Sequence, residues 1–209
     1  MTHRRAVALM VLVTLLWSIA GVVTRHLDAA RSFEVTFWRS LFNALTLAVV
    51  LNALRGPALW PGLLRGGRAL WASGLCWAAM YTAFMVALTL TTVANVLVTM
   101  AVGPLITALF ARIFLRHRLP IRTWLAIAAA GLGIAWMFGQ EARSGLSLTG
   151  TLVALAVPLA AALNFTMLQH VGHGPADPAK ATRQDMLPAV LIGAVLSALY
   201  TLPFALPFQ

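Results

Sequence analysis

Long apolar runs recur along this 209-residue chain, and they constrain its fold more than any other feature. A helix needs about 20 mainly apolar residues to cross the hydrocarbon core of a bilayer. About seven such runs follow one another here, separated by short connections rich in Gly, Pro and Arg. Hydrophobic residues make up 61% of the chain and charged residues 10%, whereas about 25% of residues are charged in an ordinary soluble domain. The sequence therefore predicts an all-α integral membrane protein.

The predicted transmembrane helices share an almost unbroken apolar composition. They cover Ala6–Thr24, Val35–Leu54, Ala69–Leu88, Thr92–Leu115, Thr123–Gly139, Leu148–Gln169 and Leu187–Leu206. The two longest connections, Arg55–Arg68 and His170–Met186, are rich in Gly and Pro and are predicted to be loops. The N-terminal run resembles a signal peptide, with Ser18-Ile19-Ala20 as a cleavage site. An uncleaved first span is the preferred interpretation, because the run continues to Thr24 and more spans follow.

The distribution of Lys and Arg predicts the orientation in the membrane, because cytoplasmic loops carry an excess of both. With the N-terminus in the cytoplasm, the cytoplasmic side holds ten of them: Arg4, Arg5, Arg55, Arg65, Arg68, Arg116, Arg118, Arg122, Lys180 and Arg183. The opposite side holds three: Arg25, Arg31 and Arg143. We therefore expect a multi-pass protein of the cell (inner) membrane with a cytoplasmic N-terminus.

The net charge of +10 follows from this arrangement and does not indicate a nucleic-acid partner, because no basic stripe interleaves with aromatic residues. The residues that catalyse reactions are also missing from the spans. All five carboxylates lie in or beside loops, and no Ser or Cys has a recognisable nucleophile setting. His170, His173 and Asp177 lie together, but in a polar Gly-Pro loop that favours solvation over metal binding. We expect no enzyme activity, no metal and no cofactor.

A weak internal repeat suggests an inverted architecture. The segment 17–26 can be aligned with the segment 161–170, with slight identity. Five spans separate the two segments, and an odd number of spans brings the second copy into the membrane upside down.

Several short motifs, taken in their order and spacing, resemble the EamA-type family of the drug/metabolite transporter superfamily. They are Leu16-Trp17-Ser18, Phe37-Trp38-Arg39, Ala94-Asn95, Gly103-Pro104, Arg118-Leu119 and Gly131-Leu132-Gly133-Ile134. The resemblance implies a secondary transporter or exporter of small metabolites, amino acids or drugs that works by alternating access. It also implies one complete five-helix repeat over residues 1–139 and part of an inverted second repeat over residues 148–209.

Two departures from the family pattern limit what the resemblance implies. His117 precedes Arg118-Leu119 where the family commonly has an acidic residue. The family has ten spans, whereas about seven are predicted here, so three helices would be missing. The alternative is therefore a truncated membrane protein that transports nothing, and is inert or acts as a partner subunit.

The fourth predicted span has one small and polar face, on which Asn95, Thr99, Gly103 and Thr107 recur every fourth residue. Two interpretations carry equal weight: the face packs against another helix, or it lines a cavity. Pro104 is expected to free a backbone carbonyl near Met100 and to bend the helix at Gly103-Pro104. In the sixth span, Pro158 is expected to have a similar effect, with Asn164 further along the helix.

Arg39 is the most informative charge within a predicted span. Its side chain either extends to the outer interface or faces the bundle interior beside Asn43, where it would bind an anionic group such as a carboxylate. Trp77 and Tyr81, four residues apart, either pack against lipid and neighbouring helices or form the wall of a site for an aromatic or amphiphilic substrate.

The predicted substrate path contains seven residues: Trp17, Arg39, Asn43, Tyr81, Asn95, Thr99 and Asn164. Because no carboxylate lies deep in a span, we expect facilitated diffusion or exchange rather than proton coupling. Glu34 is the nearest acidic residue, and pairing with Arg31 or Arg39 is its expected role. The expected partners are the lipid bilayer and a small-molecule substrate, with self-association into a homo-oligomer as a further option.

Overall fold

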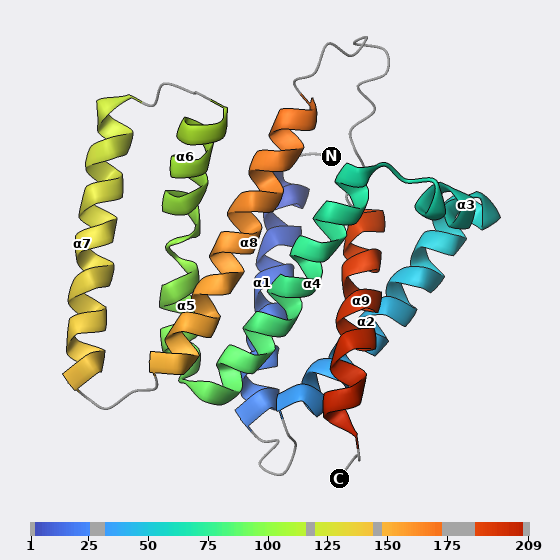
Figure 1. Ribbon diagram of the computed structural model, residues 1–209, viewed down its shortest axis with the longest axis horizontal. Helices are drawn as coiled ribbons and strands as arrows, with labels where there is room; N and C mark the ends of the chain where they lie inside the picture. Colours follow the sequence, from blue (N-terminus) through green and yellow to red (C-terminus); the bar gives the residue numbers. More distant parts are fainter. Residues whose placement is uncertain (1–2, 26–31, 116–119, 144–147, 173–186, 207–209) are drawn as a thin grey trace.

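The computed structural model describes residues 3–25, 32–115, 120–143, 148–172 and 187–206, and these form a bundle of helices (Figure 1). Six long helices each begin and end within a few residues of a predicted span. They are α1 (His3–Arg25), α2 (Ser32–Arg55), α4 (Arg68–Leu90), α7 (Ile121–Arg143), α8 (Leu148–Gly172) and α9 (Leu187–Ala205). These helices confirm the prediction of an all-α membrane protein. An apolar segment in lipid must satisfy its backbone hydrogen bonds internally, and a helix does so.

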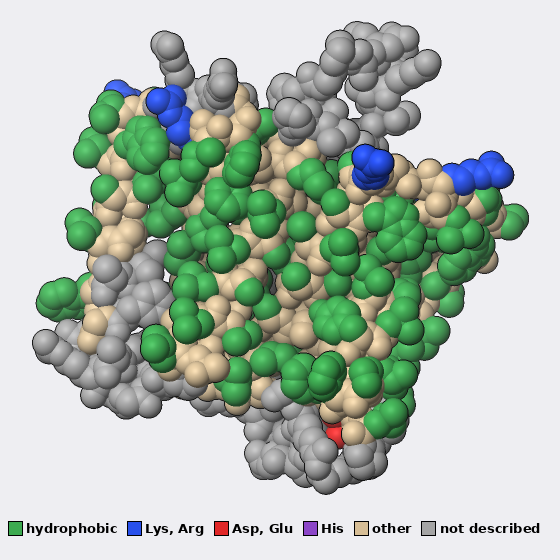
Figure 2. Space-filling view, in the orientation of Figure 1, with side chains coloured by type: hydrophobic (Ala, Val, Ile, Leu, Met, Phe, Trp, Pro, Cys, Tyr) green, Lys and Arg blue, Asp and Glu red, His purple; other side chains and the backbone are tan. Residues whose placement is uncertain are grey.

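Five helical stretches within the described ranges are long and apolar enough to cross a membrane. They are Phe33–Leu64, Arg68–Leu90, Val93–Phe114, Leu148–Gln169 and Leu187–Ala205, and α1 and α7 add the shorter apolar stretches Arg5–Leu16 and Ile121–Gly133. Hydrophobic side chains cover the middle of the face shown in Figure 2, with Lys and Arg at the upper end and an acidic side chain at the lower end. Such an apolar girdle with polar ends suits a bilayer.

The fourth apolar run is two helices rather than one, α5 (Val93–Met100) and α6 (Gly103–Phe114). At the interruption, the Val102 N–H donates to the Thr99 carbonyl at 3.2 Å. Pro104 follows at the start of α6 and has no N–H to donate to the Met100 carbonyl. The α-helical pattern of hydrogen bonds therefore stops and restarts directly at the Gly-Pro pair.

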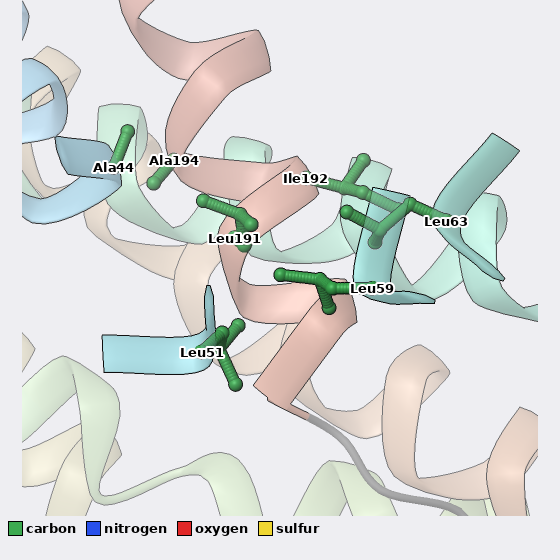
Figure 3. Packing of buried hydrophobic residues seen from close by; sticks show 7 residues of the cluster. All are labelled: Ala44, Leu51, Leu59, Leu63, Leu191, Ile192 and Ala194. Atoms are coloured by element: carbon green, nitrogen blue, oxygen red, sulfur yellow. The ribbon is translucent and has the colours of Figure 1, made fainter. Parts of the chain in front are cut away.

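The connection between α2 and α4 is helical, so the prediction of a loop over Arg55–Arg68 is wrong. It contains a 3₁₀ turn, η1 (Gly56–Ala58), and a short helix, α3 (Leu59–Leu64). Gly56, directly after α2, has a φ of 66°, a conformation that glycine adopts without a steric penalty. Leu59 and Leu63, four residues apart, are buried in a cluster with Leu51, Ala44, Leu191, Ile192 and Ala194 (Figure 3). Burial of these two leucines keeps the connection helical.

α4 is the central helix, and it packs against α8 and α9. α2 packs against α9 and α4, and α5 and α6 pack against α8. Small residues allow the closest approach: a Cβ added to Gly193 would lie 2.9 Å from the Gly74 carbonyl oxygen and 3.0 Å from the Ala78 nitrogen. In contrast, all the described side chains of α1 are exposed. The core is built mainly from α2, α4, α8 and α9, and α3 and α5 add buried side chains to it.

Candidate functional site

A polar pair on α2 faces a stripe of aromatic side chains on α4. Arg39 and Asn43 are one helical turn apart, and so are Trp77 and Tyr81, so each pair lies on one side of its helix. Asn43 and Tyr81 are joined by a side-chain hydrogen bond. The rings of Trp77 and Tyr81 are tilted by 37° with their centroids 5.7 Å apart.

The Arg39 guanidinium lies against α4. Its Cζ atom is 5.5 Å from the centroid of the Phe84 ring, a cation–π contact. Its Nη1 atom is 2.6 Å from the Met85 sulfur. The side chain is thus partly buried between two helices, at the level where α2 and α4 also share the Asn43–Tyr81 hydrogen bond.

Glu34 does not form an ion pair with Arg39, although both side chains are described. The two residues are five positions apart, so they point about 140° away from each other around α2. Glu34 is buried, and its Oε2 atom has no hydrogen-bond partner among the described residues. The expected pairing of Glu34 with Arg39 is therefore wrong, whereas Arg31 lies outside the described residues.

A hydroxyl network joins α2, α4 and α9 beside this face. Ser40 donates to the Ser197 hydroxyl at 2.9 Å, and the Ser197 and Thr82 oxygens are 3.0 Å apart. The Thr82 and Tyr200 hydroxyls are in close contact, and Tyr200 also donates to the Ala78 carbonyl at 2.9 Å. Sequence reasoning missed these residues. In the sequence, these residues stand out only as isolated Ser and Thr within apolar spans. That pattern does not show which hydroxyl groups contact each other across helices.

Asn95 forms a second polar group, between α5 and α8. Its amide nitrogen donates to the Thr151 hydroxyl at 2.7 Å and to the Thr91 hydroxyl at 3.0 Å. Its backbone N–H is capped by the Thr92 hydroxyl at 3.2 Å, and the Thr99 hydroxyl donates to the Asn95 carbonyl at 2.8 Å. The Asn95 Oδ1 atom is buried and has no partner in the described part of the chain.

Pro158 of α8 lies beside the interruption between α5 and α6. A Cβ added to Gly103 would be 3.7 Å from the Pro158 side chain, so the two proline-containing positions adjoin. Further along α8, Asn164 and Thr166 are buried, and their side-chain oxygens lack hydrogen-bond partners within the described ranges. Thr166 also lines a mainly apolar depression of about 270 Å³ together with Phe114, Leu163 and Met167.

The predicted path residues therefore fall into separate groups. Arg39, Asn43 and Tyr81 come together between α2 and α4, whereas Asn95 and Thr99 lie between α5 and α8. The apolar cluster that contains Met85 and Val96 joins the two groups. Asn164 lies on α8, and its Oδ1 atom has no hydrogen-bond partner among the described residues. The side chain of Trp17, in α1, lies outside the described residues.

The described side chains do not include a group of three or more His, Cys, Asp or Glu residues that could hold a metal ion. His173 and Asp177 lie outside the described residues, as does the side chain of His170. What the site offers is one permanent cation, amide and hydroxyl groups, and aromatic rings. Such groups bind and orient a ligand.

Comparison with known proteins identifies a family and one named relative. Residues 4–139 match the model of the EamA-like transporter family. A Pseudomonas aeruginosa protein named as an uncharacterized transporter is 27% identical over 143 residues, which cover 66% of this chain and 48% of that protein. The matched region thus spans about half the length of the relative. No solved structure matches the chain.

Proposed function

We propose that this chain, which belongs to the EamA-like transporter family, transports small metabolites, amino acids or drugs across the cell (inner) membrane by alternating access. The relative from Pseudomonas aeruginosa is named as a transporter, which supports the same class of activity. The N-terminus is cytoplasmic in this proposal, because the cationic connections then lie inside.

The observation that carries the proposal is the polar face between α2 and α4 within an apolar bundle. An arginine and an amide are expensive within a membrane span, so they mark a substrate path more often than a lipid-facing surface. Arg39 lies against Phe84 and Met85, and Asn43 is hydrogen-bonded to Tyr81. Both side chains therefore face the neighbouring helix.

Alternating access needs an element whose arrangement can change, and the α5–α6 interruption supplies a candidate. The break leaves the Met100 carbonyl without the donor that a residue other than proline would provide at position 104. It adjoins Pro158 of α8 and lies one turn beyond Thr99. In this proposal α6 moves relative to α5 about the Gly103-Pro104 pair while substrate passes.

A transport assay in proteoliposomes with a library of labelled metabolites, amino acids and drugs tests the proposal. We expect Arg39→Ala and Asn95→Ala to reduce uptake of the transported substrate at least tenfold, with Arg122→Ala on the exposed start of α7 as the control. Uptake should not require a pH gradient, because the sequence places no carboxylate deep in a span. Unchanged uptake in both site variants would refute the site, and pH-gradient-dependent uptake that is lost in Glu34→Gln would refute facilitated diffusion.

A second candidate function is that the chain acts as a subunit of a larger assembly, either with further copies of itself or with another membrane protein. The exposure of all the described side chains of α1 favours it, since a helix within a transporter bundle normally packs on several neighbours. The molar mass of the purified protein in detergent, measured by light scattering, distinguishes a monomer from such an assembly.

A further inference from the structure

We infer that the face between α2 and α4 binds an amphiphilic molecule that consists of one aromatic ring and a short chain with a carboxylate group. Arg39 binds the carboxylate group, and Trp77 and Tyr81 contact the ring. This inference rests on the proposed transport function and adds the chemistry of the substrate. It follows from the charge of Arg39, from the direction of the two helices, and from one buried donor that lacks a partner.

The charge of Arg39 is permanent and lacks a counter-ion within the described part of the chain. A guanidinium stays protonated in proteins. Among the described residues, it contacts a phenyl ring and a thioether sulfur, neither of which carries a formal charge. Glu34, whose side chain is described, does not pair with it. A carboxylate would satisfy two of its N–H groups at once and would neutralise the charge in a low-dielectric setting. A cationic substrate would instead be repelled.

The helix directions place the Arg39 guanidinium at one end of an aromatic strip, which is the row of side chains Phe84, Tyr81 and Trp77 on α4. α2 and α4 run antiparallel, because Arg39 contacts Phe84 and Met85 while Asn43, one turn later in α2, bonds to Tyr81, one turn earlier in α4. Trp77 continues the strip by a further turn and its ring contacts that of Tyr81. Seven residues of helix separate Phe84 from Trp77, which is about 10 Å. This length fits one aromatic ring with a short carboxylate chain.

The far end of the strip provides a hydrogen-bond donor. The Trp77 indole nitrogen is buried, and no acceptor contacts it among the described residues. A buried donor without a partner is costly, so a ligand oxygen placed there would gain binding free energy. The site therefore favours an acceptor oxygen at the end of the ring opposite the carboxylate.

Three probes that differ by one group each test this inference. They are 4-hydroxyphenylacetate, tyramine, which has the same hydroxylated ring but an ammonium group, and phenylacetate, which lacks the ring oxygen. Their affinities for the purified full chain in detergent are measured by titration calorimetry. We expect 4-hydroxyphenylacetate to bind at least tenfold more tightly than tyramine and severalfold more tightly than phenylacetate.

Variants assign the binding to the named residues. We expect Arg39→Gln to weaken binding of 4-hydroxyphenylacetate at least tenfold and Arg39→Lys to weaken it less, because Lys keeps the charge. Trp77→Phe, which removes the indole N–H, should remove the advantage of 4-hydroxyphenylacetate over phenylacetate. Arg122→Gln, on the exposed start of α7, is the matched control and should bind like the wild type. The Arg39→Lys variant separates the loss of charge from a failure to fold.

The inference is overturned if the wild type binds none of the probes or binds tyramine as tightly as 4-hydroxyphenylacetate. It is overturned as well if the Arg39→Gln variant keeps the preference for 4-hydroxyphenylacetate over tyramine. It is also overturned if phosphatidylglycerol displaces 4-hydroxyphenylacetate while phosphatidylcholine does not, because Arg39 would then bind a lipid phosphate. If any of these results is found and the protein still transports other molecules, the proposed transport function stands. Arg39-dependent binding in a protein that transports nothing would support the site and refute the transport function.

Discussion

Asn95 shows how single polar side chains hold the helices of this protein together. Its amide donates to Thr151 on α8 and to Thr91, while its backbone N–H is capped by Thr92. The hydrophobic effect does not drive helices together in lipid, so they are held by close packing and by hydrogen bonds across them. The sequence predicts a packing role and a path role for Asn95 with equal weight. The observed bonds account for the packing interpretation, and its place on a substrate path stays a prediction.

Removal of the Asn95 amide should therefore destabilise the bundle. We expect Asn95→Leu, which keeps the branching of the side chain and removes its hydrogen bonds, to lower the free energy of unfolding by about 1 kcal/mol. The control is Thr107→Val, since the Thr107 hydroxyl donates to the Gly103 carbonyl in its own helix at 2.9 Å and to no other helix in the described part of the chain. Reversible unfolding in mixed micelles with increasing dodecyl sulfate measures both. Equal effects of the two substitutions would contradict the inter-helix role of Asn95.

Among the helices, α4 positions the candidate site because it contacts α2, α8 and α9 together. Its approach to α9 depends on glycine: Gly74 and Gly193 lie at the crossing, where each lacks room for a Cβ atom. The same crossing brings Thr82 to Ser197 and Tyr200. A shift of α9 away from α4 would therefore break the hydroxyl network as well as the apolar contact.

A single methyl group at this crossing should have a large effect. We expect Gly193→Ala to lower the free energy of unfolding by about 1–3 kcal/mol, because the methyl group would overlap the Gly74 and Ala78 backbone atoms. Gly131→Ala on α7 is the matched control, since a Cβ there meets nothing within 4 Å. The midpoint of thermal unfolding in detergent measures the difference. A Gly193→Ala midpoint equal to that of Gly131→Ala would rule out a tight α4–α9 crossing.

The whole molecule is an apolar bundle with unlike ends. Cationic side chains gather at one end and an acidic side chain at the other, on the face seen in Figure 2. The predicted orientation places the cationic end in the cytoplasm, where α3 and its flanking Arg55 and Arg65 would lie at the inner interface. The short helix α3 presents Leu64 and Trp60 outward while it buries Leu59 and Leu63, an arrangement that suits an interfacial position.

Labelling of single cysteines tests this orientation in the full chain. In a Cys76→Ser background, we expect Ser144→Cys to react with a membrane-impermeant maleimide on intact cells. Gly67→Cys, at a position with open space for a side chain, should react only after the cells are lysed. The opposite pattern of labelling would show that the N-terminus lies outside.

Hydrophobicity and helical hydrogen bonding are local properties. They explain why the sequence by itself determined that the protein lies in a lipid bilayer, that it is helical, and approximately where its helices begin and end. Each apolar run must satisfy its backbone within itself, whatever surrounds it. The resemblance to the EamA type was also visible in the order of short motifs, and the match over residues 4–139 confirms it.

Which side chains meet was decided only by the tertiary structure. The contacts of Ser40 with Ser197 and of Arg39 with Met85 depend on the rotation and spacing of helices far apart in sequence. The helical form of α3 likewise depends on a leucine pocket that α9 helps to form. Periodicity assigns a residue to a face of its own helix. It does not state which helix that face will contact, because apolar faces are nearly interchangeable in a lipid environment.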